Sequence, residues 1–302
     1  MSRFSKFAWF AVLYNVAVIL WGAFVRATGS GAGCGSHWPL CNGEIIPRST
    51  QIETIIEFMH RITSGLSLVI VLLLLVLAFR LYPPWHRVRL SAVCSIVFII
   101  TEALVGAGLV LFRWVAQDAS NGRVISMALH LVNTFLLVAS LVLTAWWSQR
   151  RDNYSFTFSA GKAVPLGLGF LGIMFLAVSG SVTALGDTLF PASSLLEGMR
   201  QDFSPTAHFL LRLRIWHPIL AIGVGFGLVF LVGLLGMLSE ITLNKRLAAI
   251  LAGVYLLQLA AGVINLLLLA PVWLQIVHLF LEVCVWITLV LFSSETLEIK
   301  EV

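Results

Sequence analysis

Eight long apolar runs constrain the fold of this chain more than any other feature. Each is long enough to cross the hydrocarbon core of a bilayer, and short polar loops separate them. Only 11% of the residues are charged, against about 25% in a typical soluble domain. We place the spans at roughly 8–28, 54–80, 89–112, 124–147, 162–184, 211–238, 247–269 and 273–293. Little sequence remains outside them, so we predict an all-α integral membrane protein.

Basic residues predict how the chain crosses the membrane. If the N-terminus is cytoplasmic, 11 of the 19 lysine and arginine residues fall on the cytoplasmic side and eight on the outer side. Positive charge favours the cytoplasmic side, so we expect both termini there, in a multi-pass protein of the cell membrane. The first span, with about 20 apolar residues, is too long for a signal peptide and is expected to be retained. No basic run is dense enough to predict nucleic-acid binding.

The chain repeats itself, with four spans in each half. The segment EALVG at 102–106 matches QLAAG at 258–262 with an offset of 156 residues. His60 and His217 are 157 residues apart. Four spans restore the direction of the chain, so the halves are predicted to be parallel and pseudo-symmetric. We expect two four-helix bundles, at residues 1–150 and 151–302.

Four of the seven histidines begin the even-numbered spans, close to the outer face: His60, His130, His217 and His278. Ionisable residues inside spans are costly and usually functional. Two histidines that face each other across a four-helix bundle suit bis-imidazole ligation of a haem iron. Histidines that only bond neighbouring helices, and a metal other than haem iron, are the alternatives. Arginines at the span ends are candidate partners for haem propionates, namely Arg26, Arg61, Arg212 and Arg214.

Acidic residues distinguish the halves. Glu57 lies three residues before His60, on the same helix face, and its repeat counterpart is Arg214. Glu102 lies in the middle of the third span, where its counterpart is Gln258. A carboxylate beside a macrocycle can move protons, as an oxidation requires, so the first half is predicted to be the reactive one. The second half is predicted to hold a resident electron-transfer haem.

Structural roles for these two carboxylates remain open. Glu57 could be a first-turn carboxylate favoured by the helix dipole, or an ion-pair partner of Arg61. Glu102 could make a buried structural hydrogen bond.

Two of the four cysteines lie in the first outer loop, GSGAGCGSHWPLCNG, at Cys34 and Cys41. A pair this close on the oxidising face of a membrane is expected to form a disulfide, with two free thiols as the alternative. Cys94 and Cys284 fall within spans and are expected to be buried apolar residues.

Several short motifs together resemble the haem A synthase family, membrane enzymes that convert haem O to haem A. They are RATGSGAGCGSHWPLCNG after the first span, EFMHR at 57–61, MALH at 127–130, GDTLFPA at 186–192, IWHP at 215–218 and VHLF at 277–280. The resemblance covers nearly the whole chain.

This resemblance implies a division of labour between the halves. The N-terminal bundle would bind the substrate haem O through His60 and His130, with Glu57 as the catalytic carboxylate. His217 and His278 would bind a haem b cofactor. The reaction would be successive hydroxylation of one ring methyl, followed by loss of water to leave a formyl group. Candidate partners are haem O synthase, an electron acceptor, the lipid bilayer and a second copy of the chain.

Two other functions would use the same histidines. A cytochrome b-type subunit with two haems would pass electrons and modify nothing, and a haem carrier would hold haem without chemistry. The cytochrome b-type hypothesis leaves Glu57, the GDTLFP loop and the difference between the halves unexplained.

Overall fold

The eight apolar runs form long helices. The computed structural model describes residues 1–150, 154–156 and 159–300, and within them eight helices are long and apolar enough to cross a membrane. They are α1 (Arg3–Ala27), α2 (Ile52–Leu81), α3 (Arg87–Leu111), α4 (Asn121–Trp147), α5 (Ala160–Leu189), α7 continued by α8 (Phe209–Arg214 and Trp216–Leu238), α9 (Thr242–Leu267) and α10 (Val272–Leu297). The predicted all-α membrane fold is confirmed.

Local sequence accounts for where the helices begin and end. The Ser2 hydroxyl accepts a hydrogen bond from a backbone N–H in the first turn of α1, and Ser120 does the same for α4. α2 ends just before the Pro83–Pro84 pair, which lacks the N–H groups that a helix needs. Gly29 follows α1 with a φ of 70°, a left-handed conformation that glycine adopts without strain. The chain then enters the short 3-10 helix η1 (Ser30–Ala32).

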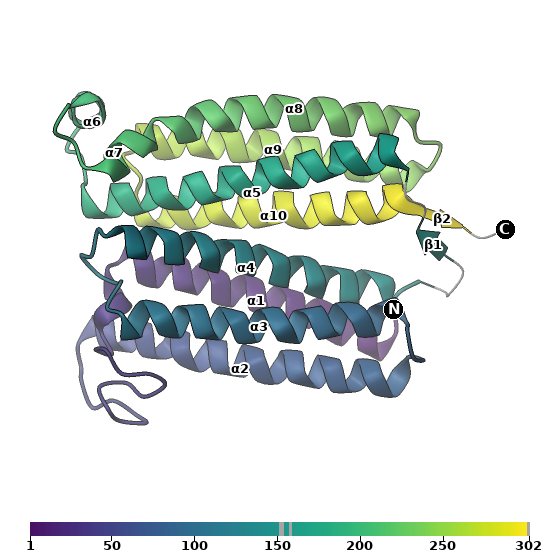
Figure 1. Ribbon diagram of the computed structural model, residues 1–302, viewed down its shortest axis with the longest axis horizontal. Coiled ribbons are helices and arrows are strands. Elements are labelled where there is room, and N and C mark those ends of the chain that lie inside the picture. The colour runs from purple at the N-terminus through teal and green to yellow at the C-terminus, as the bar shows by residue number, and fades with distance from the viewer. Residues whose placement is uncertain (151–153, 157–158, 301–302) are drawn as a thin grey trace.

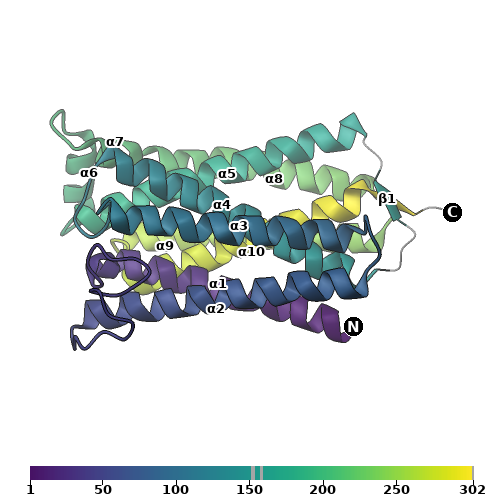
Figure 2. The same ribbon diagram turned by 60° about the horizontal axis from the view of Figure 1, so that its bottom comes forward.

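The long helices form two groups of four (Figure 1). α1–α4 make one group, and α5, α8, α9 and α10 make the other. In each group every helix packs against its neighbours in the chain, and the last packs against the first. The groups meet through α1 and α4 on one side and α5 and α10 on the other. Figure 2 shows α5 and α8 along one edge and α1 and α2 along the opposite edge.

One continuous core joins the two groups. Phe135 on α4 and Trp286 on α10 have ring centroids 4.8 Å apart, and the Trp286 indole N–H donates to the Phe135 carbonyl at 2.7 Å. This bond satisfies an indole that is otherwise buried in apolar surroundings. Elsewhere large apolar side chains such as Phe226 and Phe230 on α8 are exposed. Lipid tails are as apolar as these side chains, so this exposure fits a membrane protein.

The sixth span, predicted as one helix over 211–238, is broken near its start. α7 ends at Arg214 and α8 begins at Trp216. Pro218 accounts for the break, because it has no N–H to bond the carbonyl of Arg214 four residues earlier. A further helix, α6 (Leu195–Phe203), lies in the loop before α7 and was not predicted.

The two ends of the molecule differ. Both chain termini lie at one end, and the loop after α1 and helix α6 lie at the other (Figure 1). We call this second end the histidine end, because His60, His130, His217 and His278 lie toward it. At the terminal end β1 (Tyr154–Phe156) pairs antiparallel with β2 (Glu298–Lys300). The predicted boundary between the halves, at 150/151, borders residues 151–153, which lie outside the described residues.

Candidate functional site

The four histidines lie at similar depth below the histidine end. His60 is the ninth residue of α2, His130 the tenth of α4 and His278 the seventh of α10. His217 is the ninth residue counted from the start of α7. With a rise of about 1.5 Å per residue, these depths agree to within roughly 5 Å. All four side chains are partly buried.

In the C-terminal bundle the two histidine rings face each other. The ring centroids of His217 and His278 are 6.4 Å apart, and the rings are perpendicular. The Ser179 hydroxyl lies 3.0 Å from Nδ1 of His217, and the Gln258 side-chain nitrogen lies 3.4 Å from Nε2 of His278. Ser179 holds one nitrogen of the His217 ring and leaves Nε2 for another partner.

The spacing of these rings fits a metal held between them. Metal–imidazole bonds of about 2 Å on either side place two ring centres roughly 6 Å apart, close to the observed 6.4 Å. Buried Nδ1 atoms of His60, His130 and His278 have no hydrogen-bond partner among the described residues. No group of three or more His, Cys, Asp or Glu side chains suited to a metal ion occurs in the described part of the chain. The C-terminal bundle therefore offers a facing pair of imidazoles, which is the ligand set of a bis-histidine haem, and His60 and His130 occupy the equivalent helices of the N-terminal bundle.

In the N-terminal bundle a carboxylate lies beside one histidine. Oε1 of Glu102 on α3 is 3.5 Å from Nδ1 of His130. Glu102 also accepts hydrogen bonds from the Asn133 side chain, at 2.5 Å, and from the Thr134 hydroxyl. A carboxylate beside an imidazole can orient the ring and raise its basicity. The structural hydrogen bonds considered for Glu102 are present, and they direct its carboxylate toward His130.

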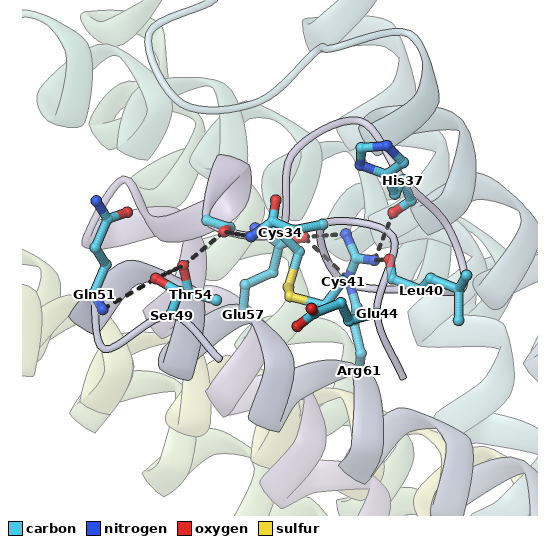
Figure 3. Close-up of a disulfide and its surroundings, with 12 residues drawn as sticks. Cys34, His37, Leu40, Cys41, Glu44, Ser49, Gln51, Thr54, Glu57 and Arg61 are labelled. Carbon is cyan, nitrogen blue, oxygen red and sulfur yellow. Dashed lines mark hydrogen bonds and ion pairs between the residues drawn. A yellow bond between two sulfur atoms is a disulfide. The ribbon is translucent and has the colours of Figure 1, made fainter. Parts of the chain in front are cut away.

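Glu57 is buried, only 4% exposed, and bonds to the loop after α1. Its Oε2 accepts the backbone N–H of Cys34 at 2.8 Å, and its Oε1 accepts two N–H groups of Arg61, at 2.5 and 3.1 Å. Figure 3 shows Glu57 and Arg61 reaching from α2 to this loop. The ion pair with Arg61, one of the alternatives from the sequence, is therefore present.

The loop itself is closed by a disulfide between Cys34 and Cys41, as predicted (Figure 3). Arg61 donates to the carbonyls of His37 and Leu40, both at 2.6 Å, and so holds the middle of the loop. Gly33 lets the loop touch α2, because an added Cβ would lie 2.3 Å from the backbone oxygen of Glu53.

Three of the four arginines predicted to meet propionates bond to side chains, and all four bond to the protein. Arg26 donates to the Ala184 carbonyl, to Thr188 and to the Gln275 side chain, at 2.8, 3.2 and 2.9 Å. Because Arg26 is on α1 while these partners are on α5 and α10, it links the two bundles. The propionate role of Arg26 stays a prediction.

The other predicted arginines hold the loops of the histidine end. Arg214 forms ion pairs with Asp187 at 2.8 Å and Asp202 at 2.6 Å, and Arg212 donates to the Pro205 carbonyl. The GDTLFPA motif is thereby explained, because its Asp187 pairs with Arg214 and its Thr188 with Arg26. The propionate roles of Arg61, Arg212 and Arg214 also stay predictions.

The structure adds one carboxylate that the sequence analysis missed. Glu282 lies on α10, one turn after His278, and is partly buried. Its counterpart, 148 residues earlier, is Thr134, which bonds to Glu102. The offset of 148 residues between His130 and His278 could have drawn attention to Glu282, because the same offset aligns it with Thr134. Each bundle thus has a carboxylate at this level, on its third helix in the first half and its fourth in the second.

Comparison with known proteins decides the family. A family model described as COX15-CtaA, cytochrome oxidase assembly protein, matches residues 5–290. The chain belongs to this family. It is the family of haem A synthase, so the resemblance carried by the motifs is confirmed.

Individual relatives match different shares of the chain. A Thermus thermophilus protein named "Protoheme IX farnesyltransferase" is 48% identical over 297 residues, which make up 98% of this chain and 49% of that protein. Proteins named "Heme A synthase" from Bacillus mycoides and Bacillus cereus are 40% identical over 146 residues, 47% of this chain and 44% of theirs. The chain therefore spans about half the length of the curated relatives it matches.

Proposed function

We propose that this protein is a haem A synthase, which oxidises a ring methyl of haem O to a formyl group by successive hydroxylation. The observation that carries the proposal is the difference between the two histidine pairs. Glu57 and Glu102 accompany the N-terminal pair, whereas Arg214 and Gln258 occupy the matching positions beside the C-terminal pair. Membership of a family that acts in haem A biosynthesis supports the same activity.

In this proposal the N-terminal bundle binds and orients the substrate. His60 and His130 hold the iron of haem O from α2 and α4. The Glu102 carboxylate lies 3.5 Å from Nδ1 of His130 without a hydrogen bond to it, and we propose that Nε2 meets the iron. Each hydroxylation replaces one hydrogen of the methyl group with a hydroxyl group. With water as the oxygen source, each step releases two protons and two electrons, and the electrons pass to the electron acceptor. After the second, loss of water leaves the formyl group.

Glu57 is the group proposed to accept a proton. It lies one helical turn before His60, and Arg61 and the Cys34 N–H hold its carboxylate in a fixed position. The loop closed by Cys34 and Cys41 covers this carboxylate and limits its contact with water.

The C-terminal bundle is proposed to hold haem b between His217 and His278. A bis-histidine haem there supplies one-electron transfer when bound. Ser179 orients the His217 ring through Nδ1 and leaves Nε2 for the iron. We further propose that the termini are cytoplasmic and that both haem positions lie near the outer face of the cell membrane.

One relative supports haem O synthase as a partner of this protein. The counterpart of this chain makes up about half of a Thermus thermophilus protein named for farnesyl transfer to protohaem IX. Farnesylation of protohaem supplies the farnesylated substrate that this reaction consumes. We therefore propose haem O synthase as a partner, alongside an electron acceptor and a second copy of the chain.

Conversion of haem O tests the proposal. The full chain is expressed in membranes that contain haem O and lack any other haem A synthase, and the extracted haems are separated by chromatography. Haem A or its hydroxylated precursor is expected, and both should disappear in the His60→Ala/His130→Ala variant. Unchanged haem O with haem B in both sites would instead favour a cytochrome b-type subunit.

A further inference from the structure

Each of the four histidine rings packs against a glycine of the helix that precedes it in the same bundle. The pairs are Gly22 with His60, Gly106 with His130, Gly180 with His217, and Gly262 with His278. The glycines lie on α1, α3, α5 and α9, and the histidines on α2, α4, α8 and α10. Both bundles therefore use the same arrangement, twice each.

The same ring atom makes the closest approach in all four pairs. A Cβ added to the glycine would lie nearest to Cε1 of the histidine, at 2.9 Å for Gly22, 2.9 Å for Gly180, 3.0 Å for Gly262 and 3.7 Å for Gly106. Carbon atoms in contact are normally about 3.5–4.0 Å apart. Three of the glycines thus leave no space for a methyl group, whereas Gly106 leaves enough.

The repeat relates these glycines to one another. Gly22 and Gly180 are 158 residues apart, and Gly106 and Gly262 are 156 apart. These offsets match the offset of 157 between His60 and His217 to within one residue. Glycine is unfavourable inside a helix, so its presence at four equivalent positions calls for a reason.

Other glycines in the spans lack this contact. An added Cβ at Gly65 on α2 or at Gly223 on α8 would meet nothing within 4 Å. A glycine in these helices is therefore not enough to predict contact with an imidazole, and the four pairs form a distinct set.

We propose that Gly22, Gly180 and Gly262 are positioning residues for the haem-ligating histidines. Each provides the space in which an imidazole lies against the neighbouring backbone, with Cε1 toward the glycine and the ring nitrogens on either side. The contact fixes the rotation of the ring and its distance from the opposite histidine. This inference rests on the proposed function, in which these histidines hold haem iron.

A methyl group at these positions should displace the ring and spare the fold. The atom that the new Cβ meets is the far end of a histidine side chain, which can rotate away, whereas the helix backbone stays in place. A displaced imidazole no longer bonds the iron, and the iron then has an open axial position.

The test uses the full chain purified in detergent, with one histidine pair removed so that each haem is observed alone. In the His60→Ala/His130→Ala background, Gly180→Ala and Gly262→Ala should lose most of the low-spin absorption of the C-terminal haem and bind carbon monoxide. In the His217→Ala/His278→Ala background, Gly22→Ala should do the same to the N-terminal haem. Gly106→Ala should keep its low-spin spectrum, because its Cβ is at an ordinary contact distance.

Matched controls are Gly65→Ala and Gly223→Ala, which add the same methyl group to the histidine-bearing helices α2 and α8 at positions where the new Cβ meets nothing within 4 Å. Both should keep the low-spin spectrum and exclude carbon monoxide. Fully low-spin spectra in Gly22→Ala, Gly180→Ala and Gly262→Ala, with haem bound, would overturn this inference alone. Equal loss in Gly223→Ala would also overturn it. A wild-type chain that binds no haem would overturn the proposed function and this inference with it.

Discussion

The two bundles share the same arrangement of helices and histidines, but residues of opposite charge hold their loops at the histidine end. In the N-terminal bundle the residue three positions before the histidine is Glu57, which bonds the backbone N–H of Cys34 and pairs with Arg61. In the C-terminal bundle the same position is Arg214, which pairs with Asp187 and Asp202.

This difference indicates where the halves diverged. The histidine pairs, their depth and their glycine contacts are common to both halves. The charged neighbours are not, and only the first half has a carboxylate three residues before its first histidine. We infer that haem binding depends on the histidines and glycines that both halves share, and that reactivity depends on the charged residues beside them. The following substitutions test this inference.

The largest effect is expected from His278→Ala. Loss of one axial imidazole should abolish the low-spin spectrum of the C-terminal haem, while the chain still inserts and the N-terminal haem keeps its low-spin spectrum. Absorption spectra with and without carbon monoxide measure this outcome, and His130→Ala should change the spectrum of the other haem instead. A normal low-spin spectrum from both sites in His278→Ala would exclude this histidine as a ligand.

Glu57→Gln should stop the reaction and keep both haems. Loss of a catalytic base typically costs about a hundredfold or more in rate, and the amide can still accept the Cys34 N–H. Haem A formation from haem O, measured per bound haem, reports the effect. Glu53→Gln, an exposed neighbour on the same helix, is the control. Wild-type haem A output from Glu57→Gln would remove Glu57 from the mechanism.

Arg214→Ala should loosen the loop that contains α6. It leaves Asp187 and Asp202 without their cation, at a cost of roughly 1–3 kcal/mol, below that of a fully buried pair, because Asp187 is 20% exposed. A lower melting temperature and faster proteolysis within 190–208 are expected. Arg61→Ala should have the smaller effect on loop proteolysis, since a disulfide still closes the loop of the first half. A larger effect from Arg61→Ala would contradict this comparison.

The smallest effect is expected from exchanging the third-helix residues between halves. Glu102→Gln removes the carboxylate beside His130 and should raise the midpoint potential of the N-terminal haem by on the order of tens of millivolts. Gln258→Glu should lower the potential of the C-terminal haem. Redox titration of each haem in turn measures both shifts. Shifts of the same sign in the two variants would contradict the expectation that a carboxylate at this position lowers the haem potential in either half.

Much of the fold could be predicted from the sequence, because membrane spans are long and their apolar character is strong. The disulfide between Cys34 and Cys41 was also accessible, since the two residues are close in sequence. Helix α6 could have been found. Ser194 and Glu197 form the S-x-x-E signature of a helix start, and the Ser194 hydroxyl does accept the Glu197 N–H. The break before α8 followed from Pro218, whose effect on a span was not considered.

The partners of the arginines could not be predicted. Arg26 reaches Ala184 and Gln275, which are 158 and 249 residues away in the chain. Such contacts depend on how the two bundles are placed against each other, and the repeat gives the fold of each half without that placement. The glycine contacts of the histidines likewise depend on which helix faces which, although the matching offsets of Gly22 and Gly180 were visible.

If the two histidine pairs hold different haems, separate extraction of each site should yield two different haems. The variant His217→Ala/His278→Ala is purified from cells that supply haem O, and so is the variant His60→Ala/His130→Ala. Our account predicts haem O or its oxidised products in the first variant and haem B alone in the second. The same haem in both variants would contradict it.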